Sequence, residues 1–388
     1  MPIGEAFEIN PKVSIKRGTE VPFISMDRLE PGCRDVDAVE TRSYSSGSKF
    51  EPGDTLMARI TPCLENGKIA RYLPKGAPLP AAGSTEFMVL RGRPGITKTE
   101  FAYYFAIDPT IHDLAVSLMT GTSGRQRVDA RAFSEAEVRI PSLEIQHAIC
   151  SVLGSLDDKI AANIETVRTI DLLRNALWHR NLTDGNTAVP LSSLASFVNG
   201  GAFTKNATGT GRVVVRIAEM NSGIGNNTVR NELDVPESKV VRTGELLFSW
   251  SGTLMTKRWP YDEALVNQHI FKVIPDHGFP LAFLDCVIKQ QLDFFRMIAS
   301  GKATTMGHIK RSDLDAKVQI PTHFREEYLR LAESLWANAS ALEKENIALA
   351  KTRDELLPLL MSGKITVREA SQAAAAAGAQ IPSKENEV

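Results

Sequence analysis

The clearest pattern along the chain is a pair of long segments whose apolar residues alternate at spacings of three and four. The first segment follows Pro141, with Asn163 as a polar interruption, and its apolar positions are Ile149, Leu153, Leu156, Ile160, Val167, Ile170, Leu173 and Leu177. The second follows Pro321 and repeats every seven residues, at Tyr328, Leu335, Leu342, Leu349 and Leu356, with Leu331 and Asn338 in the second seam. Both patterns predict long amphipathic helices of the coiled-coil type.

Each of these segments has one narrow apolar seam, so neither is stable as an isolated helix. The two seams in one chain are natural partners, and a helix pair of ~35 residues would span roughly 50 Å. The alternative is that each helix simply lies on its own domain. The length of the pattern favours packing of helix on helix, because it exceeds that of an average globular helix.

The chain also repeats itself over a long period. Val138-Arg-Ile-Pro141 recurs as Val318-Gln-Ile-Pro321, an offset of 180 residues (321 − 141), and Gly53-Asp-Thr-Leu-Met57 is echoed by Gly244-Glu-Leu-Leu-Phe248. Each copy begins with short apolar runs and turn signals, which predict strands, and continues with a helical patch, a glycine-rich loop and an Ile-Pro stop. The predicted divisions are 1–143, 144–184, 185–322, 323–362 and a frayed, flexible tail at 363–388.

Composition narrows the class of protein. The chain has 388 residues, of which 43% are hydrophobic and 23% charged, and its net charge is −1. These values are ordinary for globular domains and allow at least two cores. The four cysteines are far apart and form no Cys-x-x-Cys pattern, so we expect neither zinc nor disulfides. Because no signal peptide or membrane-length apolar run is present, we expect a soluble cytoplasmic protein.

Catalytic signatures are missing from the sequence. It contains no phosphate-binding Gly-x-x-x-x-Gly-Lys-Ser/Thr loop, no dinucleotide-binding glycine fingerprint, no amino-methyltransferase motif and no His-Glu-x-x-His. We therefore expect no catalytic residues and no metal or cofactor site in this chain. An enzyme with an unrecognised site and a coiled-coil scaffold without a DNA role remain the alternatives.

Two glycine-rich loops at equivalent places in the two copies are the candidate DNA contacts. They are residues 120–131 and 300–311, and both combine glycines and hydroxyls with cations that suit phosphates and base edges. A second pair, residues 59–68 and 249–258, follows the Gly-Asp/Glu strand of each copy. The candidate residues are Arg59, Lys68, Thr122, Ser123, Arg125, Gln126, Arg127, Lys257, Lys302, Thr304, Thr305, His308, Lys310 and Arg311.

Each candidate has a structural alternative. The glycine-rich loops could be solvated surface, and Asn66-Gly67 is an ordinary hairpin turn. For Trp250 and Trp259 we favour core or hairpin packing over base stacking, and for Asn267-Gln-His269 we favour a structural role.

Several short sequence motifs of the chain closely resemble those of type I restriction-modification specificity subunits. In the first half they are Phe7-Glu-Ile-Asn-Pro-Lys12, Pro22-Phe-Ile-Ser-Met26, residues 59–68, Ser84-Thr-Glu-Phe87 and Leu156-Asp-Asp-Lys-Ile160. In the second half they are Asn199-Gly-Gly-Ala-Phe203, Asn267-Gln-His-Ile270 and Leu356-Leu-Pro-Leu-Leu-Met-Ser-Gly-Lys-Ile365. The second long helix departs from the family, since Trp336-Ala-Asn-Ala339 stands where Asp-Asp-Lys-Ile is usual.

The resemblance implies an α+β fold with two target-recognition domains and two long antiparallel helices. Each domain would read one half of a split DNA site, and the helices would set the spacing and dock two modification subunits. Those subunits would bring S-adenosylmethionine and methylate adenine, and restriction subunits could join them. The helix positions assigned to partner contact are Leu156, Ile160, Val167, Leu335, Leu342 and Leu349.

Overall fold

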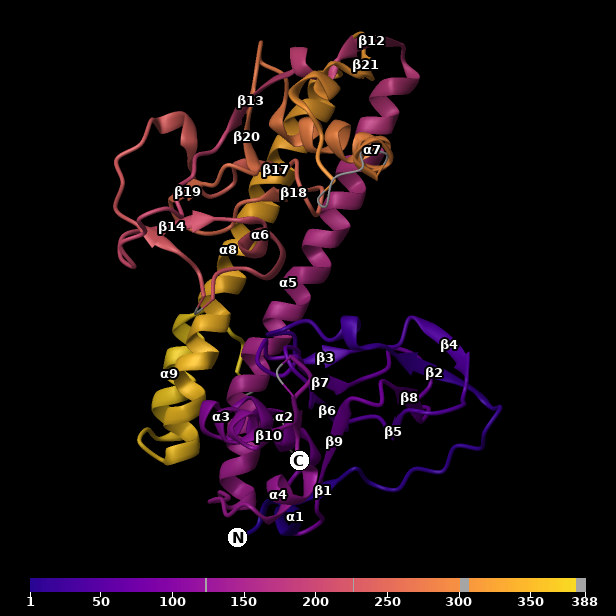
Figure 1. The fold of residues 1–388 in the computed structure, drawn as a ribbon, viewed down its shortest axis with the longest axis vertical. Coiled ribbons are helices and arrows are strands. Elements are labelled where there is room, and N and C mark those ends of the chain that lie inside the picture. The colour runs from indigo at the N-terminus through magenta and orange to yellow at the C-terminus, as the bar shows by residue number, and fades with distance from the viewer. Residues whose placement is uncertain (123, 226, 301–306, 382–388) are drawn as a thin grey trace. The chain divides into compact units, whose positions relative to one another are not determined.

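The computed structural model describes residues 1–122, 124–225, 227–300 and 307–381. It divides into two compact units, one made of Met1–Ala161 and Ala348–Val388 and the other of Ala162–Ile347. Each unit contains one mixed α/β domain and a stretch of both long helices (Figure 1). The predicted domain boundaries remain a prediction, since the division into units passes through the helices.

Two small sheets form the domain of the first unit. One has the order β1-β9-β6-β7-β3 and the other β4-β2-β8-β5, in which β2 and β8 run parallel. The strands are β1 (Phe7–Ile9), β2 (Glu20–Ile24), β3 (Asp35–Val36), β4 (Glu40–Ser43), β5 (Ser48–Phe50), β6 (Thr55–Ala58), β7 (Ile69–Tyr72), β8 (Ala81–Gly83) and β9 (Phe87–Gly92).

The domain of the second unit repeats this topology, except that its described strands include no counterpart of β3. Its sheets have the orders β13-β20-β17-β18 and β15-β14-β19-β16, and β14 and β19 are the parallel pair. The strands are β13 (Ala195–Asn199), β14 (Arg212–Val215), β15 (Arg230–Asn231), β16 (Val240–Val241), β17 (Leu246–Ser249), β18 (Met255–Arg258), β19 (Ala264–Val266) and β20 (Ile270–Pro275). The duplication predicted from sequence is therefore present in the fold.

Helices and short elements complete both domains. In the first unit they are α1 (Ile3–Ala6), η1 (Met26–Arg28), α2 (Thr99–Ile107), α3 (Pro109–Ser117), β10 (Met119–Thr120), β11 (Arg127–Val128) and α4 (Ala130–Glu135). In the second they are β12 (Asn186–Pro190), η2 (Leu191–Ser193), α6 (Ile217–Ser222), η3 (Glu237–Lys239), α7 (Leu281–Ser300), η4 (Arg311–Asp315) and β21 (Lys317–Pro321). No helix among the described residues is both long and apolar enough to cross a membrane.

One turn shows how sequence dictates the repeated geometry. The backbone N–H of Glu51 donates to the Asp54 carboxylate at 2.7 Å, and that of Arg242 donates to the Glu245 carboxylate at 2.6 Å. In each turn a glycine precedes the acidic residue. Gly53 and Gly244 have φ values of 94° and 85°, which glycine adopts without a steric penalty. The Gly-Asp and Gly-Glu pairs therefore start β6 and β17 in the same way.

The predicted long helices are α5 (Leu143–Thr183) and α8 (Glu326–Ser362). In the first unit Asp157 pairs with Arg353, and in the second unit Asn163 bonds Glu345 while Asp184 pairs with Arg325. Between the two contacts of the second unit the α5 number rises while the α8 number falls, so the helices run antiparallel there. Together with the duplicated domains, this confirms the predicted fold class.

The seam of these helices differs in part from the prediction. Leu173 and Leu331 are 44% and 42% exposed, and Asn338 is also exposed. The buried positions nearby are instead Arg174 and Trp336. Both helices of the second unit pack on its domain as well as on each other, so their buried face departs from a strict heptad seam.

The segment after the second long helix is also more ordered than predicted. Thr366 caps α9 (Val367–Ala376), whose Ala370 and Ala374 are buried in the core of the first unit. The expected helix is present, and Ala370 and Ala374, four residues apart, give α9 one face that packs closely. Residues 382–388 lie outside the described part of the chain.

A buried ion pair fixes the first domain to its helices. Arg353 of α8 donates to the Asp157 carboxylate at 2.7 Å and to the Gly32 carbonyl at 2.9 Å. The Tyr104 hydroxyl of α2 donates to the other oxygen of Asp157 at 2.8 Å. Burial raises the pKa of Asp157 even though Arg353 opposes the shift. Domain and both helices thus meet at one carboxylate.

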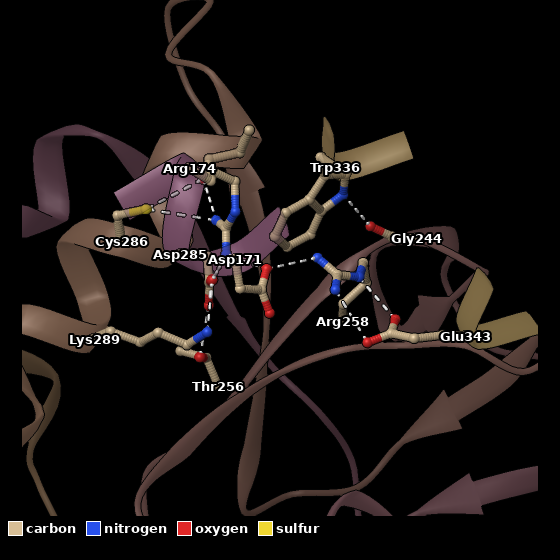
Figure 2. Close-up of polar contacts among 11 residues, drawn as sticks. Asp171, Arg174, Gly244, Thr256, Arg258, Asp285, Cys286, Lys289, Trp336 and Glu343 are labelled. Atoms are coloured by element: carbon tan, nitrogen blue, oxygen red, sulfur yellow. Dashed lines mark hydrogen bonds and ion pairs between the residues drawn. The ribbon is translucent and has the colours of Figure 1, made fainter. Parts of the chain in front are cut away.

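The second unit has an equivalent cluster, in which Arg174 of α5 is fully buried (Figure 2). Its guanidinium donates to Asp285 of α7 at 2.5 Å, and Thr256 and Lys289 bond the same carboxylate. Burial by itself would raise the pKa of Asp285, but Lys289 and Arg174 bring it below its ordinary value. The carboxylate is therefore ionised and compensated.

Trp336 of α8 completes this cluster (Figure 2). The guanidinium carbons of Arg174 and Arg258 lie 4.9 and 4.6 Å from its ring centroid, and its indole N–H donates to the Gly244 carbonyl at 2.9 Å. Arg258 in turn forms a two-bond ion pair with Glu343. Cation–π contacts of this kind are stronger when they are shielded from water.

The two clusters are related by the internal repeat, with one exchange. Arg174 and Arg353 are 179 residues apart (353 − 174), the offset that also relates Leu156 to Leu335 (335 − 156). At the same offset, Asp157 corresponds to Trp336. The carboxylate that pairs with the buried arginine is thus on a long helix in the first unit and on α7 in the second. In the second unit Trp336 occupies the helix position that is equivalent to Asp157. This accounts for the departure of the second helix from the family phrase.

Removing the α7 carboxylate tests this arrangement. We expect Asp285→Ala to lower the free energy of unfolding of the second unit by about 3–5 kcal/mol, since Arg174 stays buried without its counter-charge. Tryptophan fluorescence during urea unfolding measures this unit selectively, because all four tryptophans lie in it.

The control is Asp293→Ala on the same helix, at a side chain that is 94% exposed, where we expect a change within about 0.5 kcal/mol. Adding Trp336→Asp to Asp285→Ala should recover part of the lost stability, because it restores the arrangement of the first unit. If Asp285→Ala and Asp293→Ala lowered the stability equally, Asp285 would not be the group that compensates the buried charge of Arg174.

Candidate nucleic-acid interface

In the first unit, the two loops that the sequence singled out contact each other. The N–H of Thr61 donates to the Gln126 carbonyl, and the N–H of Gln126 donates to the Thr61 hydroxyl, each at 3.0 Å. Ile60 and Arg127 form an antiparallel bridge beside them. The loop after β6 and the loop between β10 and β11 thus form one structure, although some 60 residues separate them in sequence.

Glu86 organises the charges of this structure. Arg127 donates two bonds to its carboxylate, at 2.9 and 2.6 Å, and Arg59 lies 3.4 Å from it. These contacts, chiefly that from Arg127, lower the pKa of Glu86. Arg127 remains 46% exposed, so its guanidinium is held in one orientation while still open to solvent. Such a fixed planar donor suits a base edge or a phosphate.

The other candidates of the first unit lie around this pair of loops. Thr122 and Arg125 are exposed in the β10–β11 loop, and Gln126 is half-buried because its backbone bonds Thr61. Lys68 lies at the far end of the other loop, where its ammonium donates to the Met26 carbonyl at 2.9 Å. Ser123 lies outside the described residues.

The second unit brings the corresponding segments together in the same way. Ser251 and His308 form an antiparallel bridge, and the N–H of Ile309 donates to the Trp250 carbonyl at 3.1 Å. Lys310 and Arg311 are exposed, with Arg311 at the start of η4. Lys302, Thr304 and Thr305 lie outside the described residues.

One candidate of the second unit lies elsewhere. Lys257 is half-buried on β18, next to the buried Arg258, and lines a cleft with Asp171 and Lys289. Sequence reasoning placed it with the loop because it comes a few residues after Trp250. The hairpin between β17 and β18 is short, so Lys257 already belongs to the returning strand.

The aromatic and amide residues near these loops have structural partners. Trp259 is fully buried and its indole N–H donates to the Asp262 carbonyl, which agrees with a packing role. Trp250 donates to the Asn199 side chain at 3.0 Å, with its ring centroid 5.4 Å from that of His269. The Asn267 backbone bonds Val215 and bridges Gly201, so it connects the two sheets.

The helix positions assigned to partner contact are mostly internal. Leu156, Ile160 and Leu349 are buried in the first unit's core, so their side chains are not available to another protein. Val167, Leu335 and Leu342 are half-buried. The apolar side chains that the two helices expose in the second unit are Ile164, Leu172, Leu173 and Leu331.

Comparison with known proteins agrees with this arrangement. Residues 3–169 match the family model of the type I restriction modification DNA specificity domain. The chain is 30% identical over 149 residues to the type I restriction enzyme EcoAI specificity subunit of Escherichia coli, covering 37% of this chain and 25% of that protein. It is 27% identical over 161 residues to the EcoEI specificity subunit of the same organism, covering 40% and 27%.

The matches thus span about a quarter of the length of these curated relatives. Among solved structures, the S subunit of a type I restriction-modification system from M. genitalium superimposes with a TM-score of 0.51 at 15% identity, covering 93% of this chain and 95% of that one. At that identity the likeness shows the fold. The resemblance read from the sequence is therefore confirmed by the match of residues 3–169 to the family model of the DNA specificity domain of type I restriction-modification systems.

Proposed function

We propose that this chain is the DNA-recognition subunit of a type I restriction-modification complex, with each domain reading one half of a split site. The observation that carries the proposal is the loop pair that is built twice, at Thr61–Gln126 in one unit and Ser251–His308 in the other. A duplicated reading surface suits two half-sites on one duplex. The match of residues 3–169 to the DNA specificity domain supports it.

The chemistry of the loops fits recognition of DNA. In the first domain Arg125 is exposed and Arg127 is oriented by Glu86, so a guanidinium can present paired donors to a guanine edge. In the second domain Lys310 and Arg311 offer cations to phosphates. The low overall charge of −1 does not oppose this, because binding depends on the local surface.

The long helices would set the distance between the half-sites. Cross-contacts fix their register in each unit, through Asp157–Arg353 in the first and Asn163–Glu345 in the second. A spacer of fixed length raises the effective concentration of the second domain at its half-site.

The partners in this proposal are modification subunits, two per chain, and restriction subunits. The modification subunits carry S-adenosylmethionine and flip and methylate the target adenine. Exposed Ile164 and Leu172 on α5 provide apolar contact for docking. The chain itself is non-catalytic and acts in the cytoplasm.

The first test concerns catalysis. We expect the pure chain to transfer no methyl group from labelled S-adenosylmethionine to host DNA that lacks the modification. Transfer should begin when the modification subunit of the same system is added, since it supplies the missing catalytic site. Methyl transfer by the chain alone would show that it is an enzyme.

The second test concerns the loops. Arg125→Ala or Arg127→Ala should weaken binding of the assembled complex to its site by about 5- to 150-fold and relax the methylated motif at one base pair. Sequencing of methylated sites measures this relaxation. Arg131→Ala is the control, because Arg131 is 86% exposed on neighbouring α4 and pairs only with Glu135 among the described residues. Unchanged motifs in both loop variants would exclude this surface.

The third test concerns the helices. Four residues, about one turn or ~6 Å, are inserted both between Ala161 and Ala162 and between Ile347 and Ala348. This paired insertion preserves the cross-contacts of each unit, so the gap in the methylated motif should grow by about one or two base pairs. Inserting two residues at each place would rotate the seams and should impair assembly. An active four-residue variant with the original gap would contradict the role in spacing.

A further inference from the structure

A positively charged surface in the first domain is not part of the predicted loops. Residues 10–19, between β1 and β2, contain Lys12, Lys16 and Arg17 and no acidic residue. The stretch from β4 to β5, residues 40–50, contains Arg42 and Lys49 and one acidic residue, Glu40. In a chain with a net charge of −1, five cations against one acid on these two segments are a marked local excess.

The fold places these segments side by side. The N–H of Gly18 donates to the Tyr44 carbonyl at 2.8 Å, and the N–H of Tyr44 donates to the Thr19 carbonyl at 2.9 Å. The ammonium of Lys49 reaches back to the Ile15 carbonyl at 3.3 Å. The first segment can be followed in Figure 1 as the indigo stretch between β1 and β2, near the β4-β2-β8-β5 sheet.

The side chains of this surface are open to a ligand. Lys12, Lys16, Arg17 and Arg42 are exposed, as are the hydroxyls of Ser43, Ser45 and Ser46. Arg42 lies flat on Phe23, 4.1 Å from the ring centroid, and pairs with Glu40. Cations mixed with serine hydroxyls are the donors that proteins use to bind the sugar-phosphate backbone without reading sequence.

The surface is continuous with the predicted reading loops. A pocket of about 380 Å³ is lined by Lys12 and Lys49 on one side and by Arg59 and Thr85 on the other. Thr85 directly precedes Glu86, which orients Arg127. A duplex held at Arg127 would therefore have a neighbouring turn of backbone within reach of these cations.

The second domain lacks this excess at the corresponding place. Between β13 and β14 it has Lys205, and from β15 to β16 it has Arg230 and Lys239 together with Glu232, Asp234 and Glu237. Three cations against three acids leave no net charge. The duplicated fold thus carries a charged surface in one copy that the other copy does not repeat.

We propose that Lys12, Lys16, Arg17, Arg42 and Lys49 form a phosphate-binding surface for double-stranded DNA, adjoining the reading loops of the first domain only. The inference rests on the proposed function and adds an asymmetry to it. The first domain binds the backbone beside its half-site and supplies most of the sequence-independent affinity. The second domain depends more on its base contacts.

The test compares two charge-matched triple variants of the full chain. One carries Lys12→Gln, Lys16→Gln and Arg17→Gln, and the other carries Lys205→Gln, Arg230→Gln and Lys239→Gln. The probe is a mixed-sequence duplex of about 40 base pairs, and the readout is the slope of log affinity against log salt concentration. Each lost phosphate contact should reduce that slope by about 0.9.

We expect the first variant to lose about 2–3 units of slope, and the second to match the wild-type chain. Equal losses in both variants would mean that only overall charge matters, and would overturn the surface. An unchanged slope in the first variant would overturn it too, while salt-dependent binding by the wild type leaves the proposed function standing. A wild-type chain that binds no duplex would overturn the proposed function, and this surface with it.

Discussion

The structure of each unit depends on one arginine that is removed from water. Arg174 and Arg353 each contact the adjoining domain. Turning a domain on its helices would therefore break the Arg174–Asp285 ion pair in the second unit and the Arg353–Gly32 hydrogen bond in the first. Replacing such a pair with apolar residues is often neutral or stabilising, whereas removing one partner is costly. Its value here is geometric, because the pair specifies one orientation where apolar packing would tolerate several.

The repeat shows how such a constraint can survive the exchange of its parts. In one unit the counter-charge is Asp157 on the long helix, and in the other it is Asp285 on α7, with Trp336 at the vacated helix position. The ring of Trp336 lies against Arg174, whose guanidinium carbon is 4.9 Å from the ring centroid. The two copies have thus kept the buried guanidinium and the helix register while changing the groups that stabilise it.

Much of this could be predicted from sequence. The helices, the duplication and the repeated Gly-Asp and Gly-Glu turns follow from periodicity and local backbone preference. The predicted apolar seam was wrong at Leu173 and Leu331, which are exposed. Periodicity along the sequence does not reveal that the domain packs on the helices as well. The charged residue Arg174, next to Leu173 of the predicted seam, could have indicated a buried polar contact at this place. The joining of Thr61 to Gln126 and the role of Glu86 were not predictable, because they arise from tertiary contacts between distant loops.

The division into units has a consequence for synthesis on the ribosome. The second unit is a continuous stretch, Ala162–Ile347, whereas the first is completed by Ala348–Val388. Until that last stretch emerges, Leu156 and Asp157 lack Leu349 and Arg353, and the first core stays open. Although domains generally fold in the order in which they are made, the later unit of this chain can close first, and the earlier one must wait for the last part of α8 and for α9.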